Sequence, residues 1–404
     1  MPNRLFRLSA LFVFLFVAKT AQSQDAIWKS YIQAGVKAQQ QGKYAEAQKQ
    51  FAAAATEAEH FGANDVRLGQ TLNMLANVEQ GLAHYEQAES SYKRASAIAE
   101  HEEGPTGRNV LHSQINLASL YQDQGRFKES ESLSRQALEA MEKNYPNDKA
   151  GIAGALQNLA VLYRTEGRNT EAEALYERSL ALVKQAGGET NPAYANVLQN
   201  QSVVKREQQK YDEAETLGKQ SLAIWAQTLG DNNPTVGMGK SNLAKTYCAE
   251  KKFKEAEELS RSCLDSFQRM FDADHPYVAN CASNLAEVYI AEGKAAEAEP
   301  LCNESLRSRK MAFADAHPKV AHSLEQLGQV KEIQGKNDEA ASLYKDALVM
   351  YEKVLGTGHH PDVDSLVQRY AGLLQKMGQK AEADELLSKH HSEIAAKPDA
   401  VSPK

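Results

Sequence analysis

Four cysteines and two pairs of adjacent histidines are the residues of this chain best suited to bind a metal. The cysteines stand at Cys248, Cys263, Cys281 and Cys302, and none of them forms the closely spaced pair typical of a zinc site. The pair His390-His391 cannot share one face of a helix. His360 stands directly before a proline, as His275 and His317 do, which favours a helix-start role.

No stretch carries the spacing of a phosphate-binding loop, a hydrolase nucleophile elbow or a zinc-protease helix. We therefore predict that the protein is not an enzyme and that it holds no metal and no cofactor.

A series of amide side chains recurs at a fixed interval. Asparagine stands at five positions that are 42 residues apart, and the series continues with a glutamine and then an arginine. Asparagine offers both a donor and an acceptor, so it can pair with an extended backbone of any sequence. The series could equally bond within the fold or face water, and both readings stay open. Its members are Asn116, Asn158, Asn200, Asn242, Asn284, Gln326 and Arg369.

The N-terminus resembles a secretory signal peptide. Arg4 and Arg7 precede the apolar run from Leu8 to Ala18, and Ala21-Gln22-Ser23 has the small residues of a cleavage site. The run falls short of the roughly 20 residues that span a bilayer, which favours cleavage over an uncleaved anchor. We expect residues 1–23 to be removed and the protein to be exported, to the periplasm or the cell exterior.

The remaining chain is acidic. Removing Arg4, Arg7 and Lys19 from 46 basic residues leaves 43, against 53 acidic residues, for a net charge of −10. Nucleic acids and anionic lipids bind to basic patches, and we find none, so neither is expected as a partner. No later segment is apolar enough for membrane insertion.

One seven-residue phrase occurs nine times, 41 to 43 residues apart. Such a period indicates a repeat array rather than a string of globular domains. We call the first residue of each phrase the turn residue. The turn residues are Gly42, Ala83, Gly125, Gly167, Gln209, Lys251, Gly293, Gly335 and Gly378.

Each repeat reads as two helices around its turn residue. A small residue stands seven positions before every turn residue and another five positions after it, as Ala160 and Ala172 do around Gly167. Small residues on facing helices let two backbones approach closely. In the later repeats a proline stands 17 residues before the turn residue, for example Pro192, and proline suits the first turn of a helix.

The phrases resemble the tetratricopeptide repeat, in the 42-residue form found in kinesin light chains and bacterial relatives. The resemblance rests on the pattern NLAxLY, GRxxEAExLYxRSL and a proline preceded by Asp, Asn or His, and it covers about Asp25 to Ala396. It implies an all-α, right-handed superhelical solenoid of about nine antiparallel helix pairs over residues 24–396, followed by a disordered polar tail at 397–404. The repeat that turns at Gln209 departs from the pattern at Gln201 and Lys205, which suggests a looser seam there.

The resemblance also gives the first helices a direction, because they line the concave face in this family. It implies that the amide series faces the groove and can contact a bound peptide. Arg164, Arg206 and Lys245 would make the centre of the groove basic, and Glu287, Glu325 and Glu332 would make its later part acidic. The amide-rich stripe on the same face also includes Gln70, Asn73, Asn77, Gln157, Asn196, Gln199, Asn280, Gln329 and Gln368.

By the geometry of the family, Cys281 could approach either Cys302 or Cys263. We favour the reading that the cysteines are small core residues, because Cys263 occupies a position where other repeats have Ala or Ser. The sequence thus predicts an exported, non-enzymatic scaffold that binds a protein or peptide along its groove. An enzyme subunit or a structural assembly protein of the cell envelope remains the alternative, and the oligomeric state is not indicated.

Overall fold

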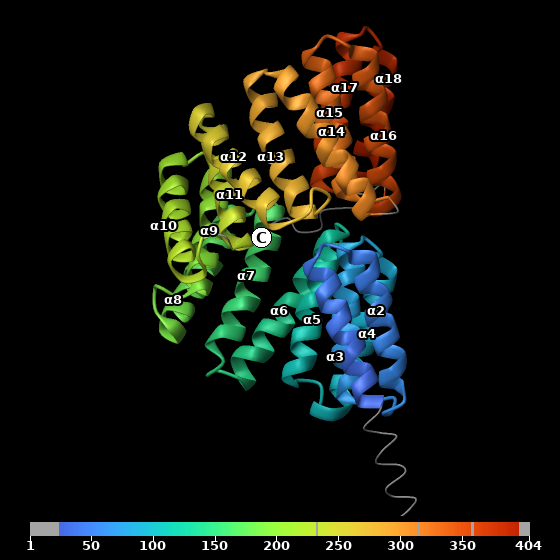
Figure 1. Ribbon diagram of the computed structural model, residues 1–404, viewed down its shortest axis with the longest axis vertical. Helices are drawn as coiled ribbons and strands as arrows, with labels where there is room; N and C mark the ends of the chain where they lie inside the picture. The colour runs from blue at the N-terminus through green and yellow to red at the C-terminus, as the bar shows by residue number, and fades with distance from the viewer. Residues whose placement is uncertain (1–23, 232, 314–315, 357–358, 396–404) are drawn as a thin grey trace, which may run out of the picture. The chain divides into compact units, whose positions relative to one another are not determined.

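The computed structural model describes residues 24–395, except 232, 314–315 and 357–358 (Figure 1). The predicted signal peptide and polar tail lie outside these residues. All regular structure in the described part is helical, and its helices pack in consecutive pairs, so the predicted all-α array of helix pairs is confirmed. The contacts divide the chain into two compact blocks, one ending at Leu117 and the other beginning at Ala118.

The N-terminal block begins with a helix over residues 24–40. Trp28 on this helix donates from its indole N–H to the hydroxyl of Thr71, and it packs against a core that includes Leu68 and Ile98. The later helices of the block are α2 (Tyr44–Glu59), α3 (Val66–Gly81) and α4 (Tyr85–Glu103), and α5 (Arg108–Asp123) crosses the boundary between the blocks.

The C-terminal block continues the same alternation of helices (Figure 1). First helices of its repeats are α7 (Lys149–Thr165), α9 (Pro192–Glu207), α11 (Pro234–Ala249), α13 (Pro276–Glu292), α15 (Pro318–Ile333) and α17 (Pro361–Lys376). Second helices are α6 (Phe127–Asn144), α8 (Asn169–Gly187), α10 (Tyr211–Leu229), α12 (Phe253–Met270), α14 (Ala295–Ala312), α16 (Asn337–Leu355) and α18 (Lys380–Ala395).

Proline and a capping side chain together start the first helices from α9 onward. Each has proline in its first turn, and the side chain of the preceding residue accepts a hydrogen bond from the backbone two residues later. Asn191 and Asn233 cap α9 and α11, and a histidine ring nitrogen caps each of the next three. The predicted helix-start role of His275, His317 and His360 is therefore confirmed.

All nine turn residues have a left-handed backbone. Six of them are glycines, which adopt a positive φ without strain. Ala83, Gln209 and Lys251 adopt the same conformation, with φ between 60° and 65°, although they carry a Cβ. The helix must end at this point in every repeat whether or not glycine is present.

The small residues lie where two helices approach most closely. All nine residues five positions after the turn, such as Ala172 and Ala214, are buried. A Cβ built on Gly328 would lie 2.5 Å from the ring of Tyr344, so only glycine fits against that tyrosine. The predicted close contact within each helix pair is thus confirmed.

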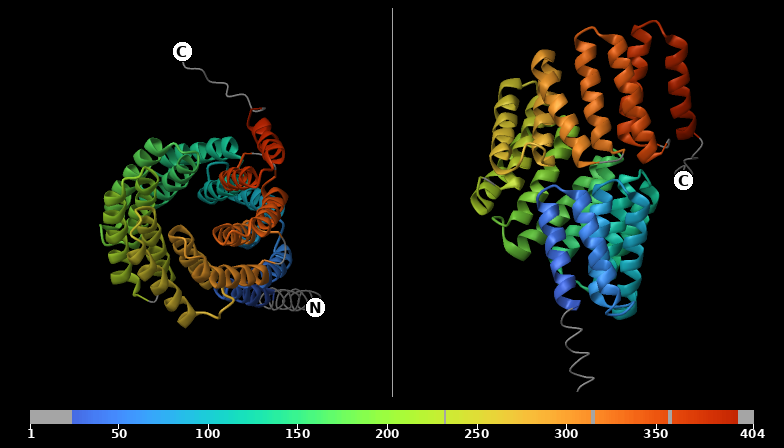
Figure 2. Two further views of the ribbon diagram at one scale, coloured as in Figure 1. Left: turned by 90° about the horizontal axis from the view of Figure 1, so that it is seen from above. Right: turned by 45° about the vertical axis from the view of Figure 1, so that its right-hand side comes forward.

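Within the C-terminal block the first helices form a layer of their own. Consecutive first helices from α7 to α15 contact one another directly, in addition to the second helices beside them, and Figure 2 shows the stacked pairs. Side chains on this layer that point toward the next first helix are therefore positioned to form contacts between repeats. We call the exposed side of this layer the first-helix face.

Candidate binding site on the first helices

One contact recurs at five consecutive seams between repeats of the C-terminal block. The residue four positions before the turn residue of one repeat contacts a glutamate of the preceding repeat. That glutamate stands six positions after the preceding repeat's turn residue. Tyr163 donates to Glu131 at 2.8 Å, for example. The others are Lys205–Glu173, Tyr247–Glu215, Tyr289–Glu257 and Lys331–Glu299, at 2.7 to 3.2 Å.

Lys205 keeps this contact although it replaces the usual tyrosine. Its ammonium lies 2.8 Å from Glu173 and 2.9 Å from Glu213. A cation at this position therefore reaches the same carboxylate as the tyrosine hydroxyl does in other repeats, and the looser seam suggested by Gln201 and Lys205 stays a prediction.

A second set of contacts joins consecutive first helices near their ends. The residue three positions before one turn residue contacts the residue two positions before the next, and we call these the end pairs. Gln122 donates to Thr165 at 3.2 Å, Arg164 lies 2.7 Å from Glu207, and Lys376 lies 2.6 Å from Glu332. An end pair satisfies two polar groups that would otherwise face solvent on the first-helix face.

The end pairs are interrupted at three consecutive seams. The residues in register there are Arg206 with Ala249, Cys248 with Ala291, and Ile290 with Ile333. Only the first of these combinations leaves a charge unpaired. The described residues place no carboxylate within ion-pair distance of the Arg206 guanidinium, and its one hydrogen bond is a long one, 3.4 Å, to the backbone oxygen of Asn242.

A third set of contacts involves the predicted amide series itself. Three members contact the residue ten positions before the preceding turn residue, and we call these contacts the middle pairs. Asn200 lies 3.5 Å from Gln157, and Arg369 lies 3.5 Å from Glu325. Gln326 is 2% exposed, accepts from the Ser283 hydroxyl and donates to the Ser283 backbone oxygen.

Middle pairs are missing at two of the three seams where the end pairs are interrupted, as they are for Asn116 and Asn158 earlier in the series. Gln199 and Asn242 are in register, yet neither side chain has a partner among the described residues. Gln199 is 5% exposed, and both of its amide atoms are buried without a hydrogen bond. At the next seam Ser241 turns to a sulfur atom, and the amide of Asn284 is left without a partner there.

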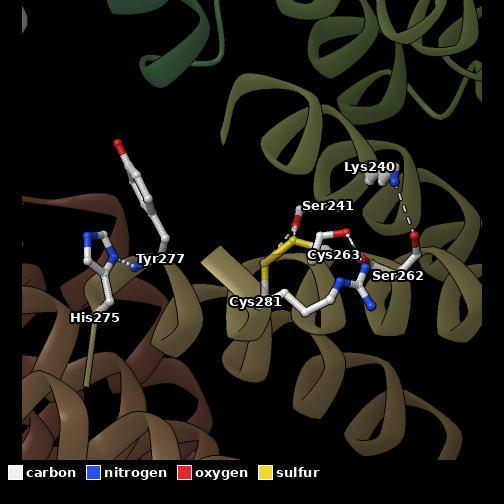
Figure 3. The surroundings of a disulfide bond; sticks show 9 residues. Lys240, Ser241, Ser262, Cys263, His275, Tyr277 and Cys281 are labelled. Atoms are coloured by element: carbon white, nitrogen blue, oxygen red, sulfur yellow. Dashed lines mark hydrogen bonds between the residues drawn. A yellow bond between two sulfur atoms is a disulfide. The ribbon is translucent and has the colours of Figure 1, made fainter. Parts of the chain in front are cut away.

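The sulfur atom that Ser241 contacts belongs to a disulfide (Figure 3). Cys263 on α12 is bonded to Cys281 on α13, with Cα atoms 6.0 Å apart. The Ser241 hydroxyl donates to Cys263 Sγ at 3.2 Å, as Figure 3 shows. The preference for these two cysteines as plain core residues was wrong, because the helices bring them within bonding distance. Cys302 is buried and Cys248 half-buried, both as free thiols.

The remaining predicted contacts fall into two groups. Asn116 and Asn158 have side chains without partners among the described residues, Asn116 half-buried and Asn158 exposed. Lys245 lies 3.4 Å from Glu287, and Arg164 is held by Glu207, so two of the three cations predicted for the centre are already paired.

Charge and burial single out Arg206 among these cations. Desolvation by the surrounding protein lowers the pKa of Arg206, against the opposing effect of Glu207 and Glu287. Those two carboxylates are engaged with Arg164 and Lys245. Arg206 is therefore a cation that the described protein surrounds but does not pair.

The repeat period marks Gln199 and Arg206 as candidates, but it does not by itself show that they lack partners. Arg206 is unpaired because Ala249 stands where its carboxylate partner would be. An alanine side chain has no polar atom that would mark it as part of a site. The signal was present in the repeat period, since Glu207 stands 42 residues before Ala249.

The described residues contain no group of three or more His, Cys, Asp or Glu side chains that could hold a metal ion. Over the same residues, no helix combines the length and apolar character needed to cross a membrane.

The tetratricopeptide repeat model matches residues 67–143, 151–227, 235–311 and 282–353, which is more than half of the chain. The chain belongs to the tetratricopeptide repeat family. Members of this family are interaction scaffolds built by stacking helix pairs. No curated protein matched the chain.

Solved structures of tetratricopeptide repeat proteins include similar chains. BtubC (BKLC) from P. vanneervenii is 25% identical, with a TM-score of 0.45, over 59% of this chain and 93% of that one. Repeats from a putative kinesin light chain of Podospora anserina are 24% identical, with a TM-score of 0.42, over 52% and 99%. A Rap protein complexed with Competence and Sporulation Factor is 13% identical, with a TM-score of 0.53, over 87% and 99%, and shares the fold.

Proposed function

We propose that this tetratricopeptide repeat protein is an exported scaffold that binds an extended protein segment along its first-helix face and catalyses no reaction. The observation that carries the proposal is that both kinds of pair are missing at the two seams between α9 and α13. Between α9 and α13 the end pairs and the middle pairs both stop, and polar groups of Gln199, Arg206, Asn242 and Asn284 are left without full partners. Buried polar groups without partners are costly, so a ligand that satisfies them gains affinity.

An extended segment is the ligand class that fits these groups. Amide side chains at a spacing of one repeat provide donors and acceptors for a backbone that runs across successive first helices. Asn200 lies on α9 beside these groups, and Asn158 on α7 would extend the contact by one repeat. A protein of the same fold has been solved with its factor bound, so the architecture is compatible with holding a ligand.

Binding is tested by selecting short random peptides, displayed with free ends, on the immobilised full chain. The triple variant N158A/N200A/N242A is expected to keep the helical circular dichroism spectrum and to weaken the selected peptides at least about tenfold. A second triple variant on the second helices, T216A/K219A/T228A, serves as the control. Equal binding by the wild type and the N158A/N200A/N242A variant would contradict the proposal.

Export is supported by the disulfide, since disulfides persist in oxidising compartments and are rare in the cytosol. Mass spectrometry of the protein recovered from its own cells tests it. We expect a mature N-terminus at Gln24 and an oxidised Cys263–Cys281 pair. A retained residue 1 together with reduced cysteines would contradict export.

A further inference from the structure

Arg206 and Gln199 stand on the same face of α9, the face turned toward α11. They are seven residues apart, which is two helical turns or about 10 Å along the axis. Arg206 reaches the backbone oxygen of Asn242 on α11, and Gln199 is in register with the Asn242 side chain. The three residues therefore border one short stretch of the seam between α9 and α11.

The other two charged end pairs show what this stretch lacks. Arg164, one repeat before Arg206, is bonded to Glu207, and Lys376 is bonded to Glu332. At the position where Arg206 would meet its carboxylate, α11 has Ala249, which is exposed and has no polar atom in its side chain. The seam therefore keeps the cation and omits the anion.

We propose that Arg206 binds a side-chain carboxylate of the segment held on the first-helix face, with the half-buried Asn242 bonding to the backbone next to that carboxylate. This inference deepens the proposed function and rests on it, because it names an aspartate or glutamate as the residue that the scaffold recognises.

The chemistry of the guanidinium favours a carboxylate. Its planar donors match the two oxygens of a carboxylate, and they are half-shielded from water at this position, which strengthens the ion pair. The lowered pKa of Arg206 has desolvation as its main cause, and a bound carboxylate would offset that cost.

An internal carboxylate fits better than a chain end. Unpartnered or weakly bonded amides lie on both sides of Arg206: Asn158 is in the preceding repeat, Asn200 is on α9 itself, and Asn242 and Asn284 are in the next two repeats. A segment that ended at Arg206 would leave one of these sides unused.

The sharpest experiment supplies the missing anion from within the protein. In A249E the new carboxylate stands where Glu207 stands against Arg164, so it should pair with Arg206. A291E is the matched control, because it adds the same charge at the same position of the next repeat, opposite the neutral Cys248. The probes are two synthetic random peptide libraries, one containing Asp and Glu and the other with Asn and Gln in their places.

We expect the acidic library to yield binders with Asp or Glu at one fixed position. Replacing that residue by its amide, or changing Arg206→Gln, should each weaken binding about tenfold, and the two changes together should cost no more than either alone. A249E should weaken the same peptides about tenfold and A291E distinctly less. Amidation of the peptide C-terminus should have no effect.

The failures are distinguishable. Two outcomes would overturn the carboxylate site and leave the scaffold proposal standing. In one, peptides that depend on the asparagines come equally from both libraries. In the other, those peptides respond alike to A249E and A291E. Loss of binding on C-terminal amidation would overturn the internal carboxylate. Absence of any binder that depends on the asparagines would remove the proposed function itself.

Discussion

Arg164 Nη1 lies 2.7 Å from Glu207 Oε1 across the seam between α7 and α9, and one repeat later Arg206 faces an alanine instead. The comparison within one chain is informative, because the repeats provide their own reference positions. A polar residue that is paired in one repeat and unpaired in the next marks a position that the packing of the repeats does not explain. Such a position is a candidate for ligand binding.

Gln209→Gly is expected to stabilise the protein by about 0.5–1 kcal/mol. Gln209 has φ 61°, and a residue with a Cβ pays for this conformation while glycine does not. Gly167→Ala, at φ 74° in the preceding repeat, should destabilise by about 1 kcal/mol. Urea unfolding of both variants measures the change in the free energy of unfolding. A Gln209→Gly variant that is less stable than the wild type would contradict the prediction.

Glu215→Gln should remove stability that depends on pH. The hydrogen bonds from Lys219, Lys252 and Tyr247, of which Lys219 has the largest effect, lower the pKa of Glu215 to about 2. Since the carboxyl has a pKa of about 4.3 when unfolded, its contribution is complete above that value and is lost as the pH falls toward about 2.

The expected loss for Glu215→Gln is about 1–2 kcal/mol at pH 7 after allowance for solvent screening, and it should shrink steadily below about pH 4. Urea unfolding across this range measures it. The exposed Glu177→Gln on α8 serves as the control and should behave as the wild type. A deficit for Glu215→Gln that stayed constant with pH would show that the carboxylate charge is not the cause.

Reduction of the Cys263–Cys281 bond should destabilise α12 and α13 by about 2–3 kcal/mol, because the intact bond closes a loop with a sequence separation of 18. Repeat arrays open locally, so amide hydrogen exchange is the suitable measurement. Exchange should accelerate in α12 and α13 on reduction and stay constant in α17. The variant C263A/C281A should not respond to reductant, and a uniform response along the chain would contradict a local role.

Arg309→Met should cost about 1–3 kcal/mol, because three acceptors lose their donor. Arg309 is 4% exposed and donates to the backbone oxygen of Lys319, to Ser323 and to Asn280. The same position of the preceding repeat holds Phe267, and Phe267→Met should cost less than about 1.5 kcal/mol. Thermal unfolding compares the two variants. A more stable Arg309→Met would show that burying this cation outweighs its three hydrogen bonds.

The sequence predicted the elements of this fold closely and their lateral contacts poorly. Proline, the small residues and the turn residue act on near neighbours in the chain, so the start of α9 at Pro192 and the end of the first helices could be derived directly. Gln326 illustrates the limit. Its amide belongs to the predicted series, but whether it is bonded or available depends on Ser283, which lies 43 residues earlier.

The candidate site follows the same division. The amide series and Arg206 could be listed from the period, while the loss of their partners requires the pairing of one first helix with the next. Residue type alone cannot show it, because Asn200 is in contact with Gln157 and Asn242 has no corresponding partner.

The five glutamate contacts at the seams have a consequence for how such a chain can change its length. Tyrosine and lysine both serve opposite the glutamate, as in Tyr163–Glu131 and Lys205–Glu173, so neighbouring repeats do not need to be matched to each other at this position. Deleting or duplicating a whole repeat, cut at equivalent positions, would preserve the glutamate contact at the new seam. Changes in repeat number by recombination can thus keep one contact constant, while contacts specific to a single seam, such as Arg164–Glu207, are the ones gained or lost.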